Sequence, residues 1–284
     1  MGYRIITDSG CDLPAKLLAQ LNIDVIPLTL LFRGQEWSDT TDEGLKTIYD
    51  GLRSGDAAST SAINPDRWSV AMEPVLEQGQ DILVLTFSSG LSTTYQSAVI
   101  AAQELMEKYP GRKIRVVDSL CASLGQGLFV WYACKNRDAG MSLDALADWC
   151  EENKLNLCHW VTVDDLSHLK RGGRISATTA LVGTMLNVKP IIHVDEEGHL
   201  INSSKVRGRK AAMEYLAKKF DETCINFDEV FIAHGDCPED AANLEAMIRA
   251  KHEIKNVTTG YVGPVIGAHT GPGVLVLFFL GSKR

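Results

Sequence analysis

Short apolar segments alternate with helical patterns through the first half of this 284-residue chain. The segments at 82–87 and 113–119 are continuous apolar runs, and residues 4–9 and 25–32 also read as buried strands. Strands of this kind are typical of parallel sheets, because helices cover both faces of such a sheet. The pattern therefore predicts an α/β fold whose N-terminal part is a parallel sheet with flanking helices.

The pattern changes near residue 156, where strands stop alternating regularly with helices. Residues 189–206 read as two strands around Glu197 and Gly198, which is a hairpin signal. Hairpins imply a mixed or antiparallel sheet, so we expect two closely packed α/β domains, residues 1–157 and 158–284. Further strands are expected at 156–163, 227–235, 256–263 and 273–280, with helices near 208–222 and 238–252.

Polar residues mark the starts of three helices in the first half. Thr41 opens one helix, and Asn64 opens another as a cap followed by Pro65 at the first helical position. Asp12 is expected to cap a third helix, with Pro14 in its first turn.

Charge and cysteine spacing exclude several classes of protein. The chain has 28 Lys and Arg against 36 Asp and Glu, a formal charge of −8, whereas general nucleic-acid binding needs a net basic face. The longest apolar run, at 274–280, is far too short to span a bilayer. The seven cysteines form no CxxC pair and suit neither a zinc site nor a disulfide framework. We therefore expect a cytoplasmic protein without nucleic-acid partner, membrane insertion, metal or cofactor.

A cluster of hydroxyl side chains follows the apolar strand at 82–87. The sequence LTFSSGLSTTYQSA (85–98) places Ser92 or Thr93 where the N-cap of the next helix belongs. Such a position suits an anion, because a helix start offers free N–H groups at the carboxyl end of a parallel strand. A phosphate loop would use several glycines and a lysine, but residues 82–106 contain one glycine and no Lys or Arg. A carboxylate held by neutral donors fits this composition better.

Two other segments resemble this loop in composition. Ser59, Thr60 and Ser61 precede a helix start, and His269 and Thr270 lie in the glycine-rich segment GPVIGAHTGPG (263–273). His269 could donate a hydrogen bond to the anion, or it could simply be a satisfied turn histidine. The hydroxyls could equally do no more than cap their helix and its turn. Serine hydrolysis is a further alternative, although the GxSxG elbow is absent.

Eight segments, in order and over the whole chain, resemble the DegV family. They are IITDSGCDLP (5–14), STSAINP (59–65), LTFSSGLSTTYQSA (85–98), VVDS (116–119), LKRGGRIS (169–176), KPII (189–192), KVRGRKAA (205–212) and GPVIGAHTGPG (263–273). The resemblance implies a two-domain α/β fold that binds a long-chain fatty acid in a buried tunnel between the domains. Some family members are the lipid-carrying subunit of a bacterial fatty-acid kinase and present the carboxylate to a separate ATP-using subunit. The chain would then be a lipid-binding protein without catalytic residues.

The resemblance also implies roles for seven residues. Those expected to bind the carboxylate are Thr60, Ser61, Ser92, Thr93 through its backbone N–H, and His269. Arg174 and Arg207 match arginines near the tunnel mouth that are linked to partner engagement in the kinase-type members. The chain departs from the family where Thr93 replaces the more usual glycine and where Pro65 follows Thr60 and Ser61 later than usual.

Basic residues gather between residues 169 and 210. This segment holds eight Lys and Arg against three Asp and Glu, a charge of +5 (8 − 3) in a chain of −8. It is either a solvated basic face or a patch that steers a negatively charged partner, here a kinase subunit carrying ATP. We expect Arg174 and Arg207 to serve phosphorylation of the carboxylate and not lipid binding. Two other functions stay open, an acyl-ester hydrolase using Ser92 and His269, and a DNA-associated regulator.

Overall fold

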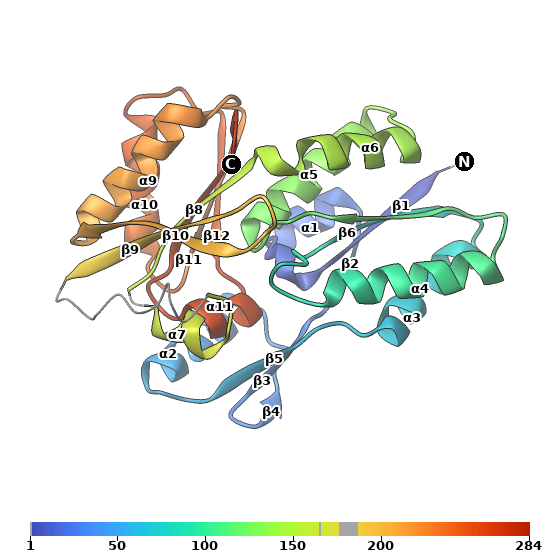
Figure 1. The fold of residues 1–284 in the computed structure, drawn as a ribbon, viewed down its shortest axis with the longest axis horizontal. Coiled ribbons are helices and arrows are strands. Elements are labelled where there is room, and N and C mark those ends of the chain that lie inside the picture. The colour runs from blue at the N-terminus through green and yellow to red at the C-terminus, as the bar shows by residue number, and fades with distance from the viewer. Residues whose placement is uncertain (1, 165, 176–186) are drawn as a thin grey trace.

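The computed structural model describes residues 2–164, 166–175 and 187–284, and its elements form three sheets with helices around them (Figure 1). The elements of the first half are β1 (Tyr3–Asp8), α1 (Ala15–Leu21), β2 (Asp24–Ile26), β3 (Thr29–Phe32), β4 (Gln35–Glu36), α2 (Asp42–Arg53), β5 (Ala58–Ser61), α3 (Pro65–Glu77), β6 (Asp81–Thr86), α4 (Thr94–Lys108), β7 (Ile114–Asp118), α5 (Leu124–Asp138) and α6 (Leu143–Asn153). Those of the second half are β8 (Leu157–Thr162), α7 (Ser167–Arg171), β9 (Val188–Val194), β10 (Leu200–Arg207), α9 (Arg209–Thr223), β11 (Glu229–His234), α10 (Pro238–Arg249), β12 (Asn256–Tyr261), α11 (Pro264–Thr270) and β13 (Leu275–Leu280).

The first sheet is parallel and confirms the predicted N-terminal α/β architecture. Its strand order is β2-β1-β6-β7, and every neighbouring pair is parallel. One face packs against α3 and α4, where Trp68 and Ala98 are fully buried. The other face packs against α5 and α6, where Phe129 and Leu146 are fully buried. Apolar side chains therefore cover both faces, as the uninterrupted apolar strands require.

The second sheet is mixed, as the hairpin signal predicts. Its order is β10-β9-β8-β13-β11-β12, with β11 and β12 parallel and the other neighbours antiparallel. Helices α9 and α10 cover one face (Figure 1). An irregularity between Asn202 and Ser204 reverses the side-chain alternation of β10. As a result, Leu200 packs toward the N-terminal half, whereas Val206 packs beneath α9.

The expected strand at 25–32 is divided between two sheets, so the prediction of a single strand is wrong. Residues 24–26 form β2 of the parallel sheet, and residues 29–32 form β3 of a separate antiparallel sheet with order β4-β3-β5. Pro27 lies between them and has no N–H to continue a ladder. The next residue, Leu28, instead donates its N–H to Ser9 Oγ at 2.9 Å. The small sheet carries β5, and with it Thr60 and Ser61.

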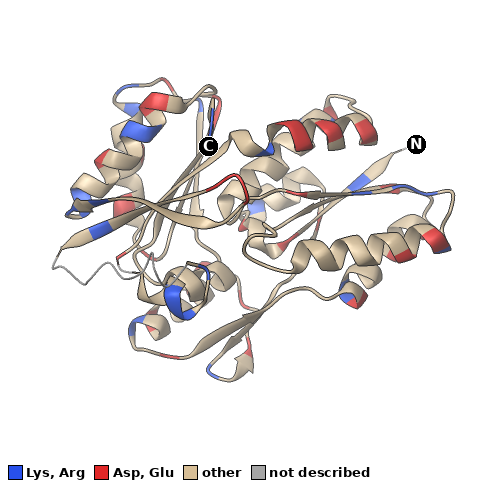
Figure 2. Cartoon of the chain, viewed as in Figure 1, with Lys and Arg blue, Asp and Glu red and all other residues tan. Residues whose placement is uncertain are grey.

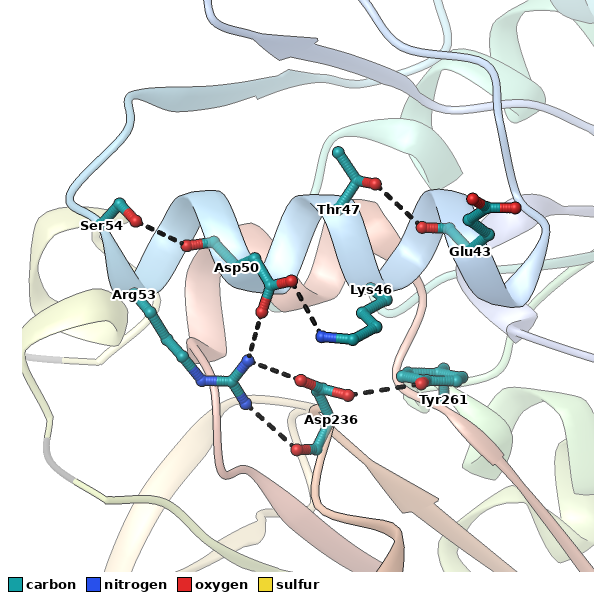
Figure 3. Close-up of polar contacts among 8 residues, drawn as sticks. All are labelled: Glu43, Lys46, Thr47, Asp50, Arg53, Ser54, Asp236 and Tyr261. Atoms are coloured by element: carbon teal, nitrogen blue, oxygen red, sulfur yellow. Dashed lines mark hydrogen bonds and ion pairs between the residues drawn. The ribbon is translucent and has the colours of Figure 1, made fainter.

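Helix α2 ties this small sheet to the second half of the chain. Tyr49 donates its hydroxyl proton to the carbonyl of Val262 at 2.7 Å, in a fully buried position. Figure 3 shows a second tie, in which Arg53 lies between Asp50 and Asp236. The Arg53–Asp236 distance is 2.5 Å, and Tyr261 donates to the other carboxylate oxygen of Asp236 at 3.3 Å. Because the ion pair is partly exposed, the buried Tyr49 contact is the more important of the two.

Two of the three expected helix caps are confirmed. Thr41 Oγ1 accepts from the N–H of Gly44, and Asn64 Oδ1 accepts from the N–H of Arg67. The third is wrong, because α1 starts after Pro14 without any side-chain cap. The carboxylate of Asp12 instead accepts a hydrogen bond from Ser123. No helix in the described part of the chain has the length and apolar character to cross a bilayer.

Candidate functional site

A cavity of about 390 Å³ lies between the parallel and the mixed sheet. Its size falls within the range of small-molecule sites. Most of its wall is apolar and comes from both halves of the chain. The apolar side chains that line it are Leu28, Ala62, Phe87, Leu91, Ala122, Val161, Leu169, Ile192, Val194, Leu200, Val262, Val265, Ile266, Val274, Val276 and Phe278.

Six of the seven residues expected at the site line this cavity. Residues far apart in sequence are brought together here by β5, by the loop before α4, by the segment after α7 and by α11. The six residues are Thr60, Ser61, Ser92, Thr93, Arg174 and His269. Three of them, Thr60, Arg174 and His269, also line a more polar cavity of about 520 Å³ beside the first one. The polar residues therefore lie where the apolar cavity meets a polar one.

The hydroxyl cluster of the loop divides into structural and cavity-lining groups. Ser88 is buried and donates its hydroxyl proton to the carbonyl of Gly198 at 2.9 Å, which fastens the loop to the β9–β10 hairpin. Thr93 holds the N-cap position of α4, as predicted, but its side chain makes no capping bond. Ser92 Oγ lies 2.8 Å from Thr94 Oγ1 and accepts from the N–H of Thr94 at 3.3 Å.

His269 is a neutral hydrogen-bonding group in this cluster. Its Nε2 lies 2.7 Å from Thr60 Oγ1. Burial, and then the nearby charge of Arg174, lowers the pKa of His269 to about 4. Gly172 makes the close approach possible, since a Cβ atom there would lie 2.2 Å from His269 Nδ1. An imidazole that stays neutral near pH 7 can donate one hydrogen bond and accept another.

The two predicted arginines occupy different places. Arg174 lines both cavities and donates from Nε to the carbonyl of Leu91 at 3.3 Å, next to Ser92. Arg207 lies exposed at the end of β10 and lines neither cavity. After the irregularity in β10, alternation places Arg207 on the same side of the sheet as Leu200. The structure thus joins Arg174 to the polar cluster and leaves Arg207 apart from it.

Sequence reasoning missed several polar residues of the cavities, His159 above all. His159 is buried, with Nδ1 2.9 Å from the carbonyl of Leu157 and Nε2 accepting from the N–H of Ala122 at 3.3 Å. Burial lowers its pKa to about 3. A neutral, fully bonded imidazole presents mainly apolar ring surface, so it is compatible with an apolar ligand. Strand alternation with Val161 is the one signal that points to His159. The other missed residues are Asp56, Ser89, Ser123, His168 and Arg171.

The polar cluster differs from a serine hydrolase site. His269 Nε2 contacts Thr60, and Ser92 contacts Thr94, so within the described ranges no bond joins Ser92 to His269. A nucleophilic serine needs a base within hydrogen-bonding reach. Across those same ranges, no group of three His, Cys, Asp or Glu side chains could hold a metal ion. The arrangement is suited to holding an anionic head group with neutral donors and one arginine.

Comparisons with known proteins agree with this fold. A family profile described as "Uncharacterised protein, DegV family" matches residues 3–282. A DegV domain-containing protein of Clostridium perfringens is 45% identical over 286 residues, which is 99% of this chain and 98% of that protein. A fatty-acid-binding DegV family protein of Thermus thermophilus has a TM-score of 0.87 at 31% identity, covering 98% of this chain and 99% of that one. A DegV lipid-binding protein of Thermotoga maritima has a TM-score of 0.87 at 28% identity and full coverage of both chains.

Proposed function

This chain belongs to the DegV family, and we propose on that premise that it binds a long-chain fatty acid in the cavity between its two main sheets. The proposal rests on one observation: the mostly apolar cavity is also lined by hydroxyl groups and a neutral histidine, which can donate hydrogen bonds to a carboxylate. The similar Thermus thermophilus protein is a fatty-acid-binding protein and the Thermotoga maritima protein is a lipid-binding protein, which supports the same ligand class here. Residues 1–157 and 158–284 are then the two domains that enclose the ligand.

Apolar burial supplies the affinity in this proposal. Each buried methylene contributes roughly 0.8 kcal/mol, so about 14 methylenes give a gross term on the order of 11 kcal/mol. Loss of translational freedom and ordering of the ligand offset a substantial part of that term. The polar cluster then determines which end of the ligand lies where, because an unpaired carboxylate in the apolar part would be strongly unfavourable.

The carboxylate is proposed to lie among Ser92, the N–H of Thr93, Thr60, Ser61 and His269. Thr60 and His269 are already bonded to each other at 2.7 Å, which keeps both oriented. Arg174 adds positive charge beside the cluster while its Nε is held by the carbonyl of Leu91. These groups bind and orient a carboxylate without any catalytic step, so the chain is proposed to be a carrier and not a hydrolase.

We further propose that the polar cavity beside the head group gives an ATP-using kinase subunit access to the carboxylate. Figure 2 shows basic residues on α7 and on β9, and Arg171 of α7 lines the polar cavity. Of the eight basic residues between 169 and 210, Lys189, Arg209 and Lys210 pair with Asp164, Asp240 and Glu214. The other five are Lys170, Arg171, Arg174, Lys205 and Arg207. Among these, Arg174 and Arg207 are the residues proposed to meet an anionic partner, in the cytoplasm where ATP is found.

Replacement of Arg207 by Ala tests the partner proposal without touching either cavity. We expect unchanged fatty-acid affinity and an about tenfold slower acyl-phosphate formation with the cognate kinase subunit at low ionic strength, because a rim charge acts mainly on association. The matched control is Lys210→Ala, which removes an exposed charge that is already 3.8 Å from Glu214. Equal rates for Arg207→Ala, Lys210→Ala and the unaltered protein would refute a partner role for Arg207.

A further inference from the structure

Asp12 follows the parallel sheet, yet its carboxylate lies against a helix of the other half of the chain. Asp12 sits just beyond β1 with a left-handed backbone, φ 50°. Its Oδ2 accepts the hydroxyl proton of Ser123 at 2.6 Å, at the start of α5. The carboxylate also accepts the N–H of Gly263, the residue before α11. From this geometry we propose that Asp12 positions α11, and through it His269, for holding the ligand's head group; this proposal rests on the proposed function.

Helix α11 starts without any capping side chain of its own. Gly263 holds its N-cap position, and glycine offers no oxygen to the free N–H groups of the first turn. Asp12 supplies that oxygen from the N-terminal half. The approach is so close that a Cβ atom on Gly263 would lie 2.0 Å from Asp12 Oδ1. Any larger residue at position 263 would therefore clash with Asp12, and the Asp12 carboxylate takes the place of a capping side chain.

A short hydrogen-bonded path leads from Asp12 to the polar cluster. The N–H of Gly267 donates to the carbonyl of Gly263 at 2.8 Å, and the N–H of Gly271 donates to the carbonyl of Gly267 at 2.8 Å. His269 lies between Gly267 and Gly271 in the sequence and contacts Thr60. A shift of the helix start would therefore move the imidazole relative to Thr60. Ser123, the other partner of Asp12, lines the apolar cavity together with Thr60 and His269.

The surroundings of Asp12 make its two hydrogen bonds important. Burial is the main cause that raises the pKa of Asp12 to about 7, while the bonds from Ser123 and Gly263 act to lower it. The nearby Asp8 raises it further, and Asp12 in turn contributes to the raised pKa of Tyr49. An enclosed carboxyl group without these partners would be costly to keep in place, so its position is tied to the start of α11.

Nuclear magnetic resonance of the histidine ring nitrogens tests the positioning without any ligand. In Asp12→Ala we expect altered ¹⁵N shifts of the His269 ring, because its contact with Thr60 changes. Asp12→Asn should restore them, since its oxygen can accept from Gly263 and its amide can donate to Ser123. Ser142→Ala is the matched control, because it removes the cap of the remote helix α6. Unchanged His269 shifts in a folded Asp12→Ala protein would overturn the proposal.

Gly263→Ala approaches the same contact from the other side if Asp12→Ala does not fold. Its methyl group would displace the carboxylate, so we expect it to alter the same His269 shifts. Fatty-acid titration supplies the second readout, with affinity about tenfold weaker in Asp12→Ala and within about threefold of the unaltered protein in Asp12→Asn. In a His269→Ala background, Asp12→Ala should cost no further affinity, whereas additive losses would contradict positioning through His269.

These measurements distinguish a failure of the proposed function from a failure of the proposed role of Asp12. If the unaltered protein binds no fatty acid, the proposed function fails, and the ring shifts still decide whether Asp12 positions His269. If the unaltered protein binds fatty acid and Asp12→Ala binds it equally well, the proposed function stands and the role of Asp12 is wrong.

Discussion

Replacing Leu200 with Trp is expected to lower long-chain fatty-acid affinity by about 100-fold or more. Leu200 lies on β10 of the hairpin and lines the apolar cavity. An indole in its place would occupy the space of about four methylenes, each worth roughly 0.8 kcal/mol of burial. The loss should grow with acyl chain length, because a longer chain needs more of the blocked space. Titration with fatty acids of increasing length measures the effect.

Ile201→Trp is the matched control for this experiment. Ile201 is the next residue of the same strand, is 37% exposed, and points to the opposite face of the sheet. The same substitution there should leave fatty-acid affinity unchanged, and comparison of melting temperatures separates blocking from misfolding. Wild-type affinity in a folded Leu200→Trp protein would mean that the ligand does not use this cavity.

Replacing Ser92 with Ala is expected to weaken fatty-acid binding by about 10- to 100-fold. The substitution removes one proposed hydrogen bond to the carboxylate, and a hydrogen bond to a charged group is worth roughly 1.5–3 kcal/mol. The effect should be confined to the free acid, since a methyl ester or alcohol of the same chain lacks the anionic head. Direct titration of acid and ester against both proteins measures the difference.

Ser97→Ala provides the comparison for this second experiment. Ser97 lies about one turn further along α4 and does not line the cavity. Its loss should change affinity for neither ligand. If Ser92→Ala binds the acid as tightly as the unaltered protein, Ser92 is not a carboxylate anchor. If acid and ester lose affinity equally, Ser92 acts on cavity shape and not on the head group.

The main layers of the fold could be predicted because their sequence signals are local. Continuous apolar runs predicted the parallel sheet, and Glu197 with Gly198 predicted the β9–β10 hairpin. The small third sheet could not be predicted, because β4 is only two residues long and β5 is rich in small polar residues. The division of 25–32 was missed for a different reason, since Pro27 can end a strand or lie at its edge.

The candidate site was only partly predictable. Ser92 could be placed because parallel strands align their carboxyl ends, and His269 because the glycine-rich segment around it, which forms α11, is unusual. The role of Asp12 could not be read from sequence, because one of its partners is the backbone N–H of Gly263 in a distant segment. Arg207 was expected at the tunnel mouth, but it lines neither cavity, and its sequence carries no local signal of that.

Native mass spectrometry of the purified protein is the direct test of fatty-acid binding. We expect a one-to-one complex whose added mass corresponds to a fatty acid, with the extracted ligand identified as a long-chain carboxylic acid. Leu200→Trp purified in parallel should carry none, and Ile201→Trp should carry the same ligand. A ligand-free protein that also fails to take up added long-chain fatty acid would contradict the account, as would an extracted ligand without a long acyl chain.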